Sequence, residues 1–402
     1  MGNEECSTSW KLSSISEVAE LSNGGTPPKS NASFWQDGKI PFVTAADLTE
    51  LYVETGRSAL TEAGLNSGKT VVCEPGDLLI GTRTRVGNCS IVKCRMGASQ
   101  DITRARLKPN CLPEFFRYFF AHAANELAFY SQGTSIQGIT RETLDDFEIP
   151  VPPLAEQRRI VARVEALTHR LDQARQARQA ALAEAATCLR AAVARAFATA
   201  AASSIRPLGN VTGIIGGNSI PENAPLPGTG EERIGLMKVS DMNASGNERF
   251  ITSCKLETSR AAAVSRKLRI VPAGAVVFPK RGGAIATNKK RVLTIPAALD
   301  PNMMGVYPQP ESGLTSDFLF WWFESLDLAE LQEDGGIPQV NKKHLDPLPI
   351  PVISEPEQHA IVTRLDAMRV KLDELQRLQR DVEAELASFT PALLAKAFRG
   401  EL

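Results

Sequence analysis

Two runs of basic side chains occupy corresponding places in the two halves of the chain, and their chemistry suits the binding of phosphate groups. Between residues 258 and 299 the sequence has nine Lys or Arg residues and no acid, and between residues 78 and 113 it has seven against Asp101 alone. Since the formal net charge is -1, these runs are local asymmetries. Each run indicates a surface that binds the phosphate backbone of a nucleic acid. The alternative is a solvated charged edge, and the recurrence of the run in both halves argues against it.

Glycine-rich segments accompany the basic runs. They are Asn23-Gly24-Gly25-Thr26-Pro27, Gly216-Gly217-Asn218-Ser219 and Lys280-Arg281-Gly282-Gly283. Backbone amides exposed by glycine can contact phosphates, although this signal is weak by itself. The predicted DNA-binding residues in these loops and runs are Lys29, Arg83, Arg85, Lys93, Lys280, Arg281, Lys289, Lys290 and Arg291.

No group of residues in the sequence assembles into an active site. Gly68-Lys69-Thr70 resembles the end of a P-loop, but Ala63 stands where the first glycine is required. There are four His and seven Cys residues with no C-x-x-C, so a metal site is not predicted, and reduced thiols, Cys188 among them, are expected to be buried. The motifs for a nucleotide cofactor, amino methylation or a serine nucleophile are absent from the sequence.

The elements that position these loops occur twice, at an offset of 201 residues. Ile149-Pro150-Val151-Pro152 precedes Glu156-Gln157 and a long helix-forming tract, and Ile350-Pro351-Val352 precedes Glu357-Gln358 and a second tract. Two polar residues, Arg178 and Gln379, fall at corresponding positions of the two apolar seams and could fix their register. The seam residues predicted to pack are Ile160, Val164, Leu167, Leu171, Ile361, Leu365, Met368, Leu372 and Leu375.

The tracts have heptad character throughout. The first seam continues through Ala174, Arg178, Ala181, Ala185 and Cys188, and the second through Val382, Leu386, Phe389 and Leu393. Ser354 and Glu357 predict a capping box at the start of the second helix, and Pro391 predicts a break near its end. Homodimerisation is one use of such tracts; equal length and equal start motifs favour an intramolecular antiparallel pair.

The two globular regions share a predicted outline of short strands and one aromatic helix. Ile40–Val43 and Leu78–Ile80 are predicted strands, and residues 112–131 and 318–331 are predicted core helices rich in Phe and Trp. Their counterparts in the second region begin at Ile234 and Val276. The predicted fold is α+β, with two similar globular α/β domains separated by two long α-helices packed as an antiparallel coiled coil. Unlike loops on a common scaffold indicate two related tasks on different targets.

This organisation resembles the specificity subunit of type I DNA restriction-modification systems over nearly the whole chain. The distinctive stretches are residues 149–160, 348–361 and 75–80, and the terminal Ala397-Phe398-Arg399-Gly400-Glu401-Leu402. The second copy departs where Asp77 becomes Ala275 and where residues 152–154 become Ile353-Ser354-Glu355. The resemblance implies target recognition domains at 1–148 and 201–348, and spacer-helix regions, conserved in the family, at 149–200 and 349–402.

The resemblance also implies a non-catalytic DNA-reading subunit. Each domain would read half of a bipartite site in double-stranded DNA, and the helix pair would set the gap and dock two adenine-N6 methyltransferase subunits, with restriction subunits as optional partners. S-adenosylmethionine, ATP and Mg would belong to those partners, and no cofactor is expected in this chain. A cytoplasmic location is expected, since no apolar run is long enough for a membrane span and the start lacks a secretory signal.

Three alternatives stay open at this point. A coiled-coil scaffold without DNA binding predicts no retention on DNA even with a methyltransferase partner. A nucleotide hydrolase acting through Lys69 predicts hydrolysis by the isolated chain. The specificity subunit of a solitary methyltransferase differs only in lacking a nuclease partner. The bases recognised and the spacer length are not encoded in any transferable way.

Overall fold

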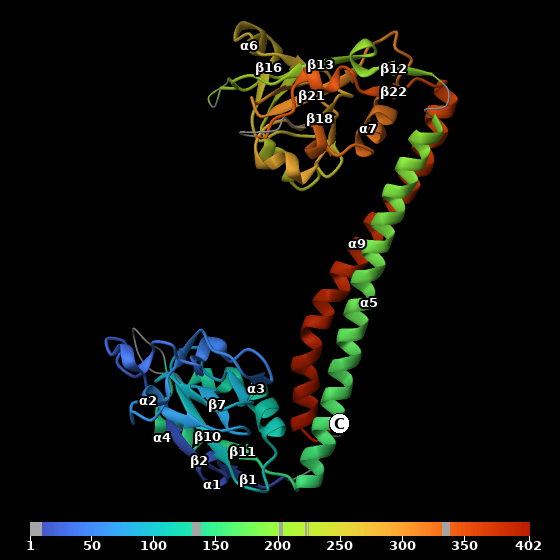
Figure 1. Ribbon diagram of the computed structural model, residues 1–402. Helices are drawn as coiled ribbons and strands as arrows, with labels where there is room; N and C mark the ends of the chain where they lie inside the picture. The colour runs from blue at the N-terminus through green and yellow to red at the C-terminus, as the bar shows by residue number, and fades with distance from the viewer. Residues whose placement is uncertain (1–9, 131–137, 201–203, 222, 224, 332–337) are drawn as a thin grey trace. The chain divides into compact units, whose positions relative to one another are not determined.

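The computed structural model describes residues 10–130, 138–200, 204–221, 223, 225–331 and 338–402. The chain divides into two compact units, one of Met1–Ala177 with Arg380–Leu402 and the other of Arg178–Gln379. Each unit contains one globular domain, here called domain 1 and domain 2, and a part of each long helix, α5 (Leu154–Ala200) and α9 (Glu355–Phe398) (Figure 1).

Domain 1 is built on a five-stranded sheet of order β2-β10-β7-β8-β4, a four-stranded sheet of order β5-β3-β9-β6 and the pair β1-β11. Its strands are β1 (Leu12–Ser14), β2 (Ala19–Asn23), β3 (Ile40–Val43), β4 (Tyr52–Val53), β5 (Ser58–Leu60), β6 (Val71–Cys73), β7 (Leu78–Gly81), β8 (Cys89–Val92), β9 (Met96–Ala98), β10 (Ile102–Leu107) and β11 (Glu148–Pro150). Its helices are α1 (Ile15–Val18), α2 (Glu62–Leu65), α3 (Pro113–Phe129) and α4 (Arg141–Asp145), with short 3-10 helices at Ala32–Phe34 and Ala45–Asp47.

Domain 2 repeats this topology with β13-β21-β18-β19-β15, β16-β14-β20-β17 and β12-β22. Its strands are β12 (Ile205–Pro207), β13 (Thr212–Gly216), β14 (Arg233–Met237), β15 (Phe250–Ile251), β16 (Glu257–Ser259), β17 (Ile270–Val271), β18 (Val276–Pro279), β19 (Arg291–Leu293), β20 (Ala297–Leu299), β21 (Met303–Pro308) and β22 (Pro349–Pro351). Its helices are α6 (Arg260–Ser265), α7 (Ser316–Glu324) and α8 (Lys342–Leu345), with 3-10 helices at Leu208–Asn210, Val239–Asn243, Gly283–Thr287 and Leu328–Leu331.

The strand order of the two domains agrees strand for strand, including the parallel pairs β3/β9 and β4/β8 in domain 1 and β14/β20 and β15/β19 in domain 2. The predicted strands Ile40–Val43 and Leu78–Ile80 are confirmed as β3 and β7. The α+β class with a duplicated domain, predicted from the sequence, is therefore the observed fold.

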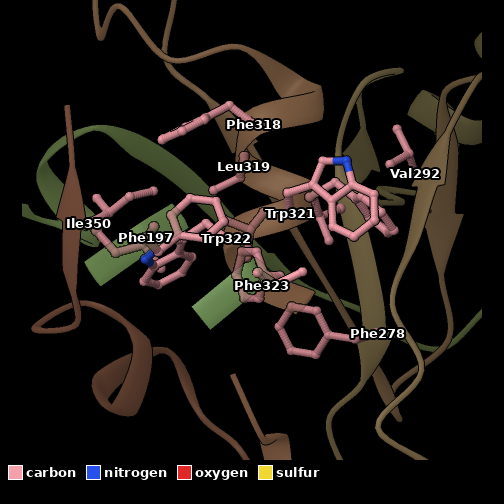
Figure 2. Packing of buried hydrophobic residues seen from close by; sticks show 14 of the residues in the cluster. Phe197, Phe278, Val292, Phe318, Leu319, Trp321, Trp322, Phe323 and Ile350 are labelled. Carbon is pink, nitrogen blue, oxygen red and sulfur yellow. The ribbon is translucent and has the colours of Figure 1, made fainter. Parts of the chain in front are cut away.

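The aromatic helices form the core of each domain. In domain 1, Phe115, Phe116 and Phe120 of α3 are almost completely buried. In domain 2, Trp321 and Phe323 of α7 pack with the domain core, as Figure 2 shows. Burying each such side chain contributes about 1.5–3 kcal/mol. The second aromatic helix is shorter than the predicted 318–331, because α7 ends at Glu324 and a separate 3-10 helix follows. The first ends at Phe129, and residue 131 lies outside the described residues.

A buried glutamine joins each long helix to a domain. The side chain of Gln157 accepts a hydrogen bond from the Leu112 amide (2.8 Å) and donates to the carbonyls of Asn110 (3.1 Å) and Pro152 (2.8 Å). In domain 2, Gln358 makes the same three bonds, accepting from the Thr315 amide and donating to the carbonyls of Gly313 and Ile353. Both side chains are fully buried, so the Gln of each Glu-Gln motif is the attachment point between helix and domain.

A phenylalanine at the far end of each long helix packs on an aromatic helix. In the first unit Phe398 of α9 lies against Phe115 and Phe119 of α3, with ring centroids 5.3 and 5.4 Å apart. In the second unit Phe197 of α5 lies 5.1 Å from Phe318 of α7. Each domain therefore holds the beginning of one long helix and the end of the other, which requires the helices to run antiparallel.

The predicted seam residues lie on the packed side of both helices. Ile160, Val164 and Leu171 in the first unit and Leu365 and Leu372 in the second are buried. The remaining ones are partly buried: Leu167, Ile361, Met368 and Leu375. Within each unit, segments of the two helices share one apolar core, and the predicted antiparallel coiled coil is confirmed.

The seam was predicted wrongly in its later parts. In α5 the first buried positions after Arg178 are Leu189 and Val193, one residue beyond the predicted series, and Cys188 is exposed. Two successive four-residue steps near Leu171 shift the apolar stripe, as a stutter does in a heptad repeat. In α9, Val382 and Phe389 are 36% and 39% exposed, so the first unit's seam is narrower than the sequence pattern indicated.

The two polar seam residues face each other. The Arg178 guanidinium donates to the carbonyl of Gln379 (3.0 Å), and the Gln379 amide donates to the carbonyl of Arg178 (2.8 Å). The two positions differ by the same 201 residues as the rest of the repeat, so equivalent residues of the two helices bond to each other's backbone. A shift of one residue would break both bonds, so the pair can specify the register.

The ends of α9 agree with the sequence only in part. The Glu357 carboxylate accepts hydrogen bonds from the backbone amide (3.0 Å) and hydroxyl (2.6 Å) of Ser354. Pro391 was predicted to break the helix, but α9 continues to Phe398. An interior proline costs about 3 kcal/mol, and the burial of Leu393 and Leu394 in the core of the first unit offsets that cost.

Candidate nucleic-acid interface

One turn in domain 1, here called the junction turn, brings three loops together. It consists of Ser99–Asp101 between β9 and β10. The glycine loop after β2 is bound through the Gly24 amide to the Ile102 carbonyl (2.8 Å) and through the Gly25 amide to the Ala98 carbonyl (3.0 Å). The loop after β3 and the basic loop after β7 are bound through Asp101.

Domain 2 has an equivalent junction turn, Asp300–Asn302 between β20 and β21. The Gly217 amide donates to the Met303 carbonyl (3.0 Å), and the Lys280 amide donates to the Asn302 carbonyl (2.7 Å). In domain 1 the matching bond runs from the Thr82 amide to the Asp101 carbonyl (2.9 Å). The glycine loops and basic loops singled out from the sequence therefore meet at the same place in both domains.

Glycine is required where the loop passes over the junction turn. A Cβ atom on Gly24 would lie 2.1 Å from the Ser99 carbonyl oxygen, and one on Gly217 would lie 1.9 Å from the Asp300 carbonyl oxygen. Backbone oxygens cannot move aside as a flexible side chain can. These two glycines thus serve close backbone approach.

The basic loop of domain 1 presents two exposed arginines. Arg83 and Arg85 flank Thr84, and neither has an ion-pair partner among the described residues. Arg85 has φ +53°, in the left-handed region. Lys29, beyond the glycine loop, is also exposed, whereas the exposed Lys93 forms an ion pair with Glu54 at 3.3 Å. Arg83, Arg85 and Lys29 are thus available to an anionic partner.

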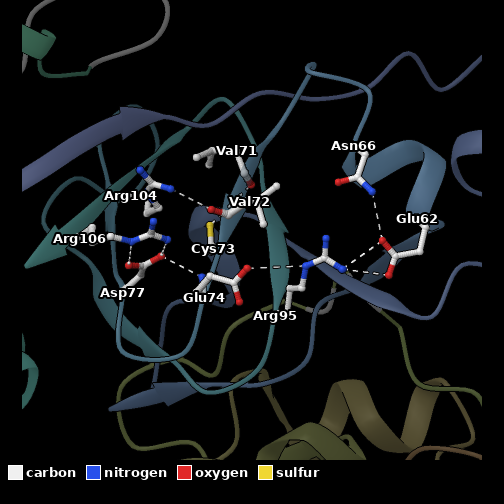
Figure 3. Close-up of polar contacts among 10 residues, drawn as sticks. All are labelled: Glu62, Asn66, Val71, Val72, Cys73, Glu74, Asp77, Arg95, Arg104 and Arg106. Carbon is white, nitrogen blue, oxygen red and sulfur yellow. Dashed lines mark hydrogen bonds and ion pairs between the residues drawn. The ribbon is translucent and has the colours of Figure 1, made fainter.

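Three other basic residues of the same run are structural. Arg106 forms a two-pronged ion pair with buried Asp77 (2.9 and 2.8 Å), and Arg104 donates to the Val72 carbonyl (3.0 Å). Arg95 pairs with Glu62, as Figure 3 shows. Hydrogen bonding to Asp77 raises the pKa of Arg106. The basic surface of domain 1 is consequently smaller than the sequence count indicates.

Domain 2 gathers a basic cluster of Lys280, Arg281 and Arg269. Burial, with repulsion from Arg269 and Arg281, lowers the pKa of Lys280. Arg281 is exposed and belongs to a backbone bridge with Gln339. The Arg269 guanidinium donates to the Gly216 carbonyl (3.4 Å) beside the glycine loop. Like charges held this close favour an anion that neutralises them.

Two predicted DNA contacts in domain 2 are corrected. Lys290 is 2% exposed, and its ammonium donates to the Leu326 carbonyl (2.7 Å). Burial lowers its pKa to about 8. Arg291 donates to the carbonyls of Asn247 (2.7 Å) and Lys290 (2.8 Å), so it ties loops together inside the domain. Lys289 is half-buried, and its ammonium contacts the side-chain oxygen of Asn243. Charge runs in a sequence do not separate such inward-facing side chains from surface ones.

Sequence reasoning missed three residues of this region as site candidates. They are Asp101, Asp300 and Arg269. The two aspartates lie in the junction turns, and Asp101 was visible as the only acid in its basic run. Arg269 was counted in the second run but not selected, because its nearness to the glycine loop depends on tertiary structure.

The P-loop alternative conflicts with the local fold. Gly68, with φ +70°, lies in the turn between helix α2 and strand β6, and the Thr70 hydroxyl donates to the Ala98 carbonyl (2.9 Å). A P-loop instead runs from a strand into a helix, whose N-terminus faces the phosphates. Lys69 therefore lacks the surroundings of a nucleotide-binding lysine.

Among the described residues, no group of three or more His, Cys, Asp or Glu side chains could hold a metal ion. Buried Cys73, Cys89 and Cys254 have pKa values raised to about 12, chiefly by burial. Cys6 lies outside the described residues. In the part of the chain that the structure describes, no helix has the length and apolar character for a membrane span.

Comparison with known proteins shows which proteins this chain resembles. A sequence model of the type I restriction modification DNA specificity domain matches residues 8–182. The type I restriction enzyme StySPI specificity subunit of Salmonella potsdam is 25% identical over 429 residues, covering 98% of this chain and 89% of that protein. The chain is thus similar over nearly its whole length to type I restriction enzyme specificity subunits, and its residues 8–182 match their DNA specificity domain.

Other relatives match a shorter part of the specificity subunit. The EcoR124I/EcoR124II specificity subunit of Escherichia coli is 26% identical over 164 residues, which is 39% of this chain and only 40% of that relative. Two solved structures share the whole fold at 24% identity. One, from work on complex assembly and conformational transition of the type I R-M system, has a TM-score of 0.75 and covers 98% of this chain and 99% of that chain. The HsdS subunit from Thermoanaerobacter tengcongensis has a TM-score of 0.65, with 98% of each chain covered.

Proposed function

We propose that this specificity subunit reads a bipartite sequence in double-stranded DNA, one half with each domain, and has no catalytic role of its own. The observation that carries the proposal is the duplicated junction turn. In both domains it presents a glycine loop beside exposed arginines, while the surrounding loops differ. Two readers of the same architecture with unlike loops suit a site made of two unlike halves.

The proposed phosphate contacts are the basic side chains that the fold leaves accessible. They are Lys29, Arg83 and Arg85 in domain 1, and Arg269, Lys280 and Arg281 in domain 2. Bases would be read from the same loops, by Arg with guanine or by Asn and Gln with adenine. Arg83→Ala or Arg281→Ala should weaken DNA binding by the assembled complex.

The test of these contacts uses the salt dependence of binding. Each lost phosphate contact should lower the slope of log K against log salt by about 0.9. Arg260→Ala is the matched control for Arg281→Ala. Arg260 is exposed in the same domain as Arg281 but is paired with Glu232 (2.9 Å). An unchanged affinity and slope for both Arg83→Ala and Arg281→Ala would contradict the assignment of these loops.

The helix pair would act as the spacer between the readers. α5 has 47 residues and α9 has 44, which at ~1.5 Å per residue gives each a length of roughly 65–70 Å. The reciprocal Arg178–Gln379 pair supports a fixed register. One heptad inserted after Arg178 and one before Gln379 would preserve the seam and the Arg178–Gln379 pair and lengthen the helix pair by roughly 10 Å.

The predicted outcome is a longer gap between the half-sites. At ~3.4 Å per base pair, roughly 10 Å corresponds to about three base pairs. The modified motif in DNA methylated by the inserted variant gives the gap directly. An unchanged gap in an active complex would refute the spacer role.

We further propose that the helices dock two adenine-N6 methyltransferase subunits, with restriction subunits as further partners in systems that cleave DNA. These partners would supply the S-adenosylmethionine, ATP and Mg chemistry. A groove of about 920 Å³ between α5 and α9 in the second unit is a suitable surface, lined by small residues such as Ala191, Ala192 and Ala360 and by Arg195 and Arg364. Small side chains permit close approach of another helix.

Filling the groove tests this docking surface. Ala191→Trp should abolish co-purification of a methyltransferase subunit expressed with the chain, without lowering the chain's melting temperature. Ala180→Trp, at an exposed position of α5 outside the groove, is the control. Normal co-purification with Ala191→Trp would exclude this groove as the docking site.

A further inference from the structure

The carboxylate of Asp101 connects two loops of domain 1. It accepts a hydrogen bond from the Ala45 amide (3.0 Å) in the loop after β3, and another from the Thr84 hydroxyl (2.9 Å) in the basic loop after β7. The Ser99 hydroxyl also donates to it. Burial acts to raise the pKa of Asp101, but the bonds from Ser99, Ala45 and Thr84 outweigh it, and the pKa is lowered. The group is therefore an ionised acceptor at neutral pH.

Domain 2 supplies the corresponding carboxylate from a different sequence position. By the 201-residue offset, Asp300 corresponds to Ser99 and Asn302 to Asp101. The Asp300 carboxylate nevertheless accepts from the Val239 amide (3.3 Å), the counterpart of Ala45 in the loop after β14. The Asn302 amide donates to Asp300 as well (2.7 Å). In both domains, therefore, a carboxylate of the junction turn accepts from the equivalent loop amide, although a different position of the repeat supplies it.

The loop held by Asp101 is the one with the exposed arginines. Thr84 lies between Arg83 and Arg85, and Arg85 has a left-handed φ that a non-glycine residue adopts only when neighbouring contacts hold it. The Thr84–Asp101 bond is such a contact. In domain 2, the backbone amide of Lys280 donates to the carbonyl of Asn302, in the turn that carries Asp300 (2.7 Å). The Asp300 carboxylate also attracts the Lys280 ammonium and acts to raise the pKa of Lys280, against the burial that lowers it. In each domain the carboxylate thus interacts with the basic loop from the junction turn.

We propose that Asp101 and Asp300 are positioning residues for DNA recognition. Each fixes the basic loop of its own domain relative to a neighbouring loop, the one after β3 in domain 1 and the one after β14 in domain 2. This inference rests on the proposed function. The carboxylates do not contact DNA; they act through the loops that do. Each should affect only the half-site that its own domain reads.

The test uses the complete complex and compares the two half-sites. Asp101→Asn and Asp300→Asn are made separately, and adenine methylation is sequenced on genomic DNA, with every substituted version of each half-site scored. Asp101→Asn should lower discrimination at the domain 1 half-site at least about tenfold, the scale of one lost base contact. Discrimination at the domain 2 half-site should stay as in the wild type, and Asp300→Asn should show the reverse.

Two further variants separate positioning from a general folding defect. Thr84→Val keeps the Asp101–Ala45 bond and removes only the bond to the basic loop, so it should reduce discrimination at the domain 1 half-site alone. Ser99→Asp combined with Asp101→Asn transfers the domain 2 arrangement into domain 1. It should recover part of the discrimination lost in Asp101→Asn.

The possible results distinguish this inference from the proposed function. A wild-type chain that gives no bipartite motif would sink the proposed function itself. If the wild type gives one, then full discrimination in both Asp101→Asn and Thr84→Val would overturn the positioning role. Equal losses at both half-sites in variants that melt like the wild type would overturn it too.

Discussion

Gln157→Ala should loosen the attachment of α5 to domain 1 by about 3–5 kcal/mol. The Gln157 side chain is fully buried and satisfies one backbone amide, at Leu112, and two carbonyls, at Asn110 and Pro152. Leaving a buried polar group without a partner costs about 1–3 kcal/mol. Water entering the vacated space would hydrogen-bond to some of these three backbone groups, so the expected loss of stability is below the sum of three full desolvation penalties.

Gln157→Glu is the matched isosteric variant. It keeps an acceptor for the Leu112 amide but places a carboxylate oxygen against two carbonyls that need donors, and it buries a charge. It should therefore destabilise at neutral pH at least as much as alanine does. Gln176→Ala, at an exposed position of the same helix, should change stability by less than about 0.5 kcal/mol.

Urea unfolding and amide hydrogen exchange measure these effects. Exchange at the Leu112 amide should accelerate strongly in both Gln157 variants, because alanine removes the acceptor of this amide and glutamate destabilises the joint around it. It should stay unchanged in Gln176→Ala. A loss below about 1 kcal/mol for Gln157→Ala, or a Gln157→Glu protein as stable as the wild type, would refute the reasoning about the buried joint.

Three further predictions follow from the packing of single residues. Burial lowers the pKa of Lys290 in the folded protein to about 8, so the cost of burying its charge is present below pH 8 and disappears as pH rises. In urea titrations the wild type should therefore gain about 2.5 kcal/mol of stability relative to Lys290→Met between about pH 7 and pH 10. A difference in stability that stays constant with pH would contradict this. Gly24→Ala should cost at least about 2 kcal/mol in thermal unfolding, since its Cβ would overlap the Ser99 carbonyl, whereas Gly283→Ala, where a Cβ meets nothing within 4 Å, is the control. Phe197→Ala should cost about 3–5 kcal/mol by removing a buried ring, and a value near that of an exposed alanine substitution would show that the end of α5 is not anchored.

Much of the architecture could be predicted because it repeats. The 201-residue offset by itself relates the two long helices. Short apolar runs identify β3 and β7, and aromatic residues at helical spacing identify the aromatic helices. The seam residues from Ile160 to Leu171 follow a regular pattern. Beyond Leu171 the phase changes, and nothing in the alanine-rich sequence favours Leu189 over Cys188 strongly enough to reveal it.

The candidate interface was less predictable, because charge in a sequence carries no direction. Arg83 and Arg281 are exposed as expected. In the same runs, however, Arg106 is paired with buried Asp77, and Lys290 is buried against the Leu326 carbonyl. The aspartates of the junction turns were invisible as a pair, since they occupy different positions of the repeat and correspond only in space.

Mapping of modified adenines in the host genome, with and without this chain, tests the central claim most directly. The expected result is a motif of two short half-sites separated by a fixed gap of unspecified bases, methylated only when this chain is present. Exchange of domain 1 for that of another specificity subunit should change one half-site and keep the other. A continuous motif, or methylation that persists unchanged without the chain, would contradict the account.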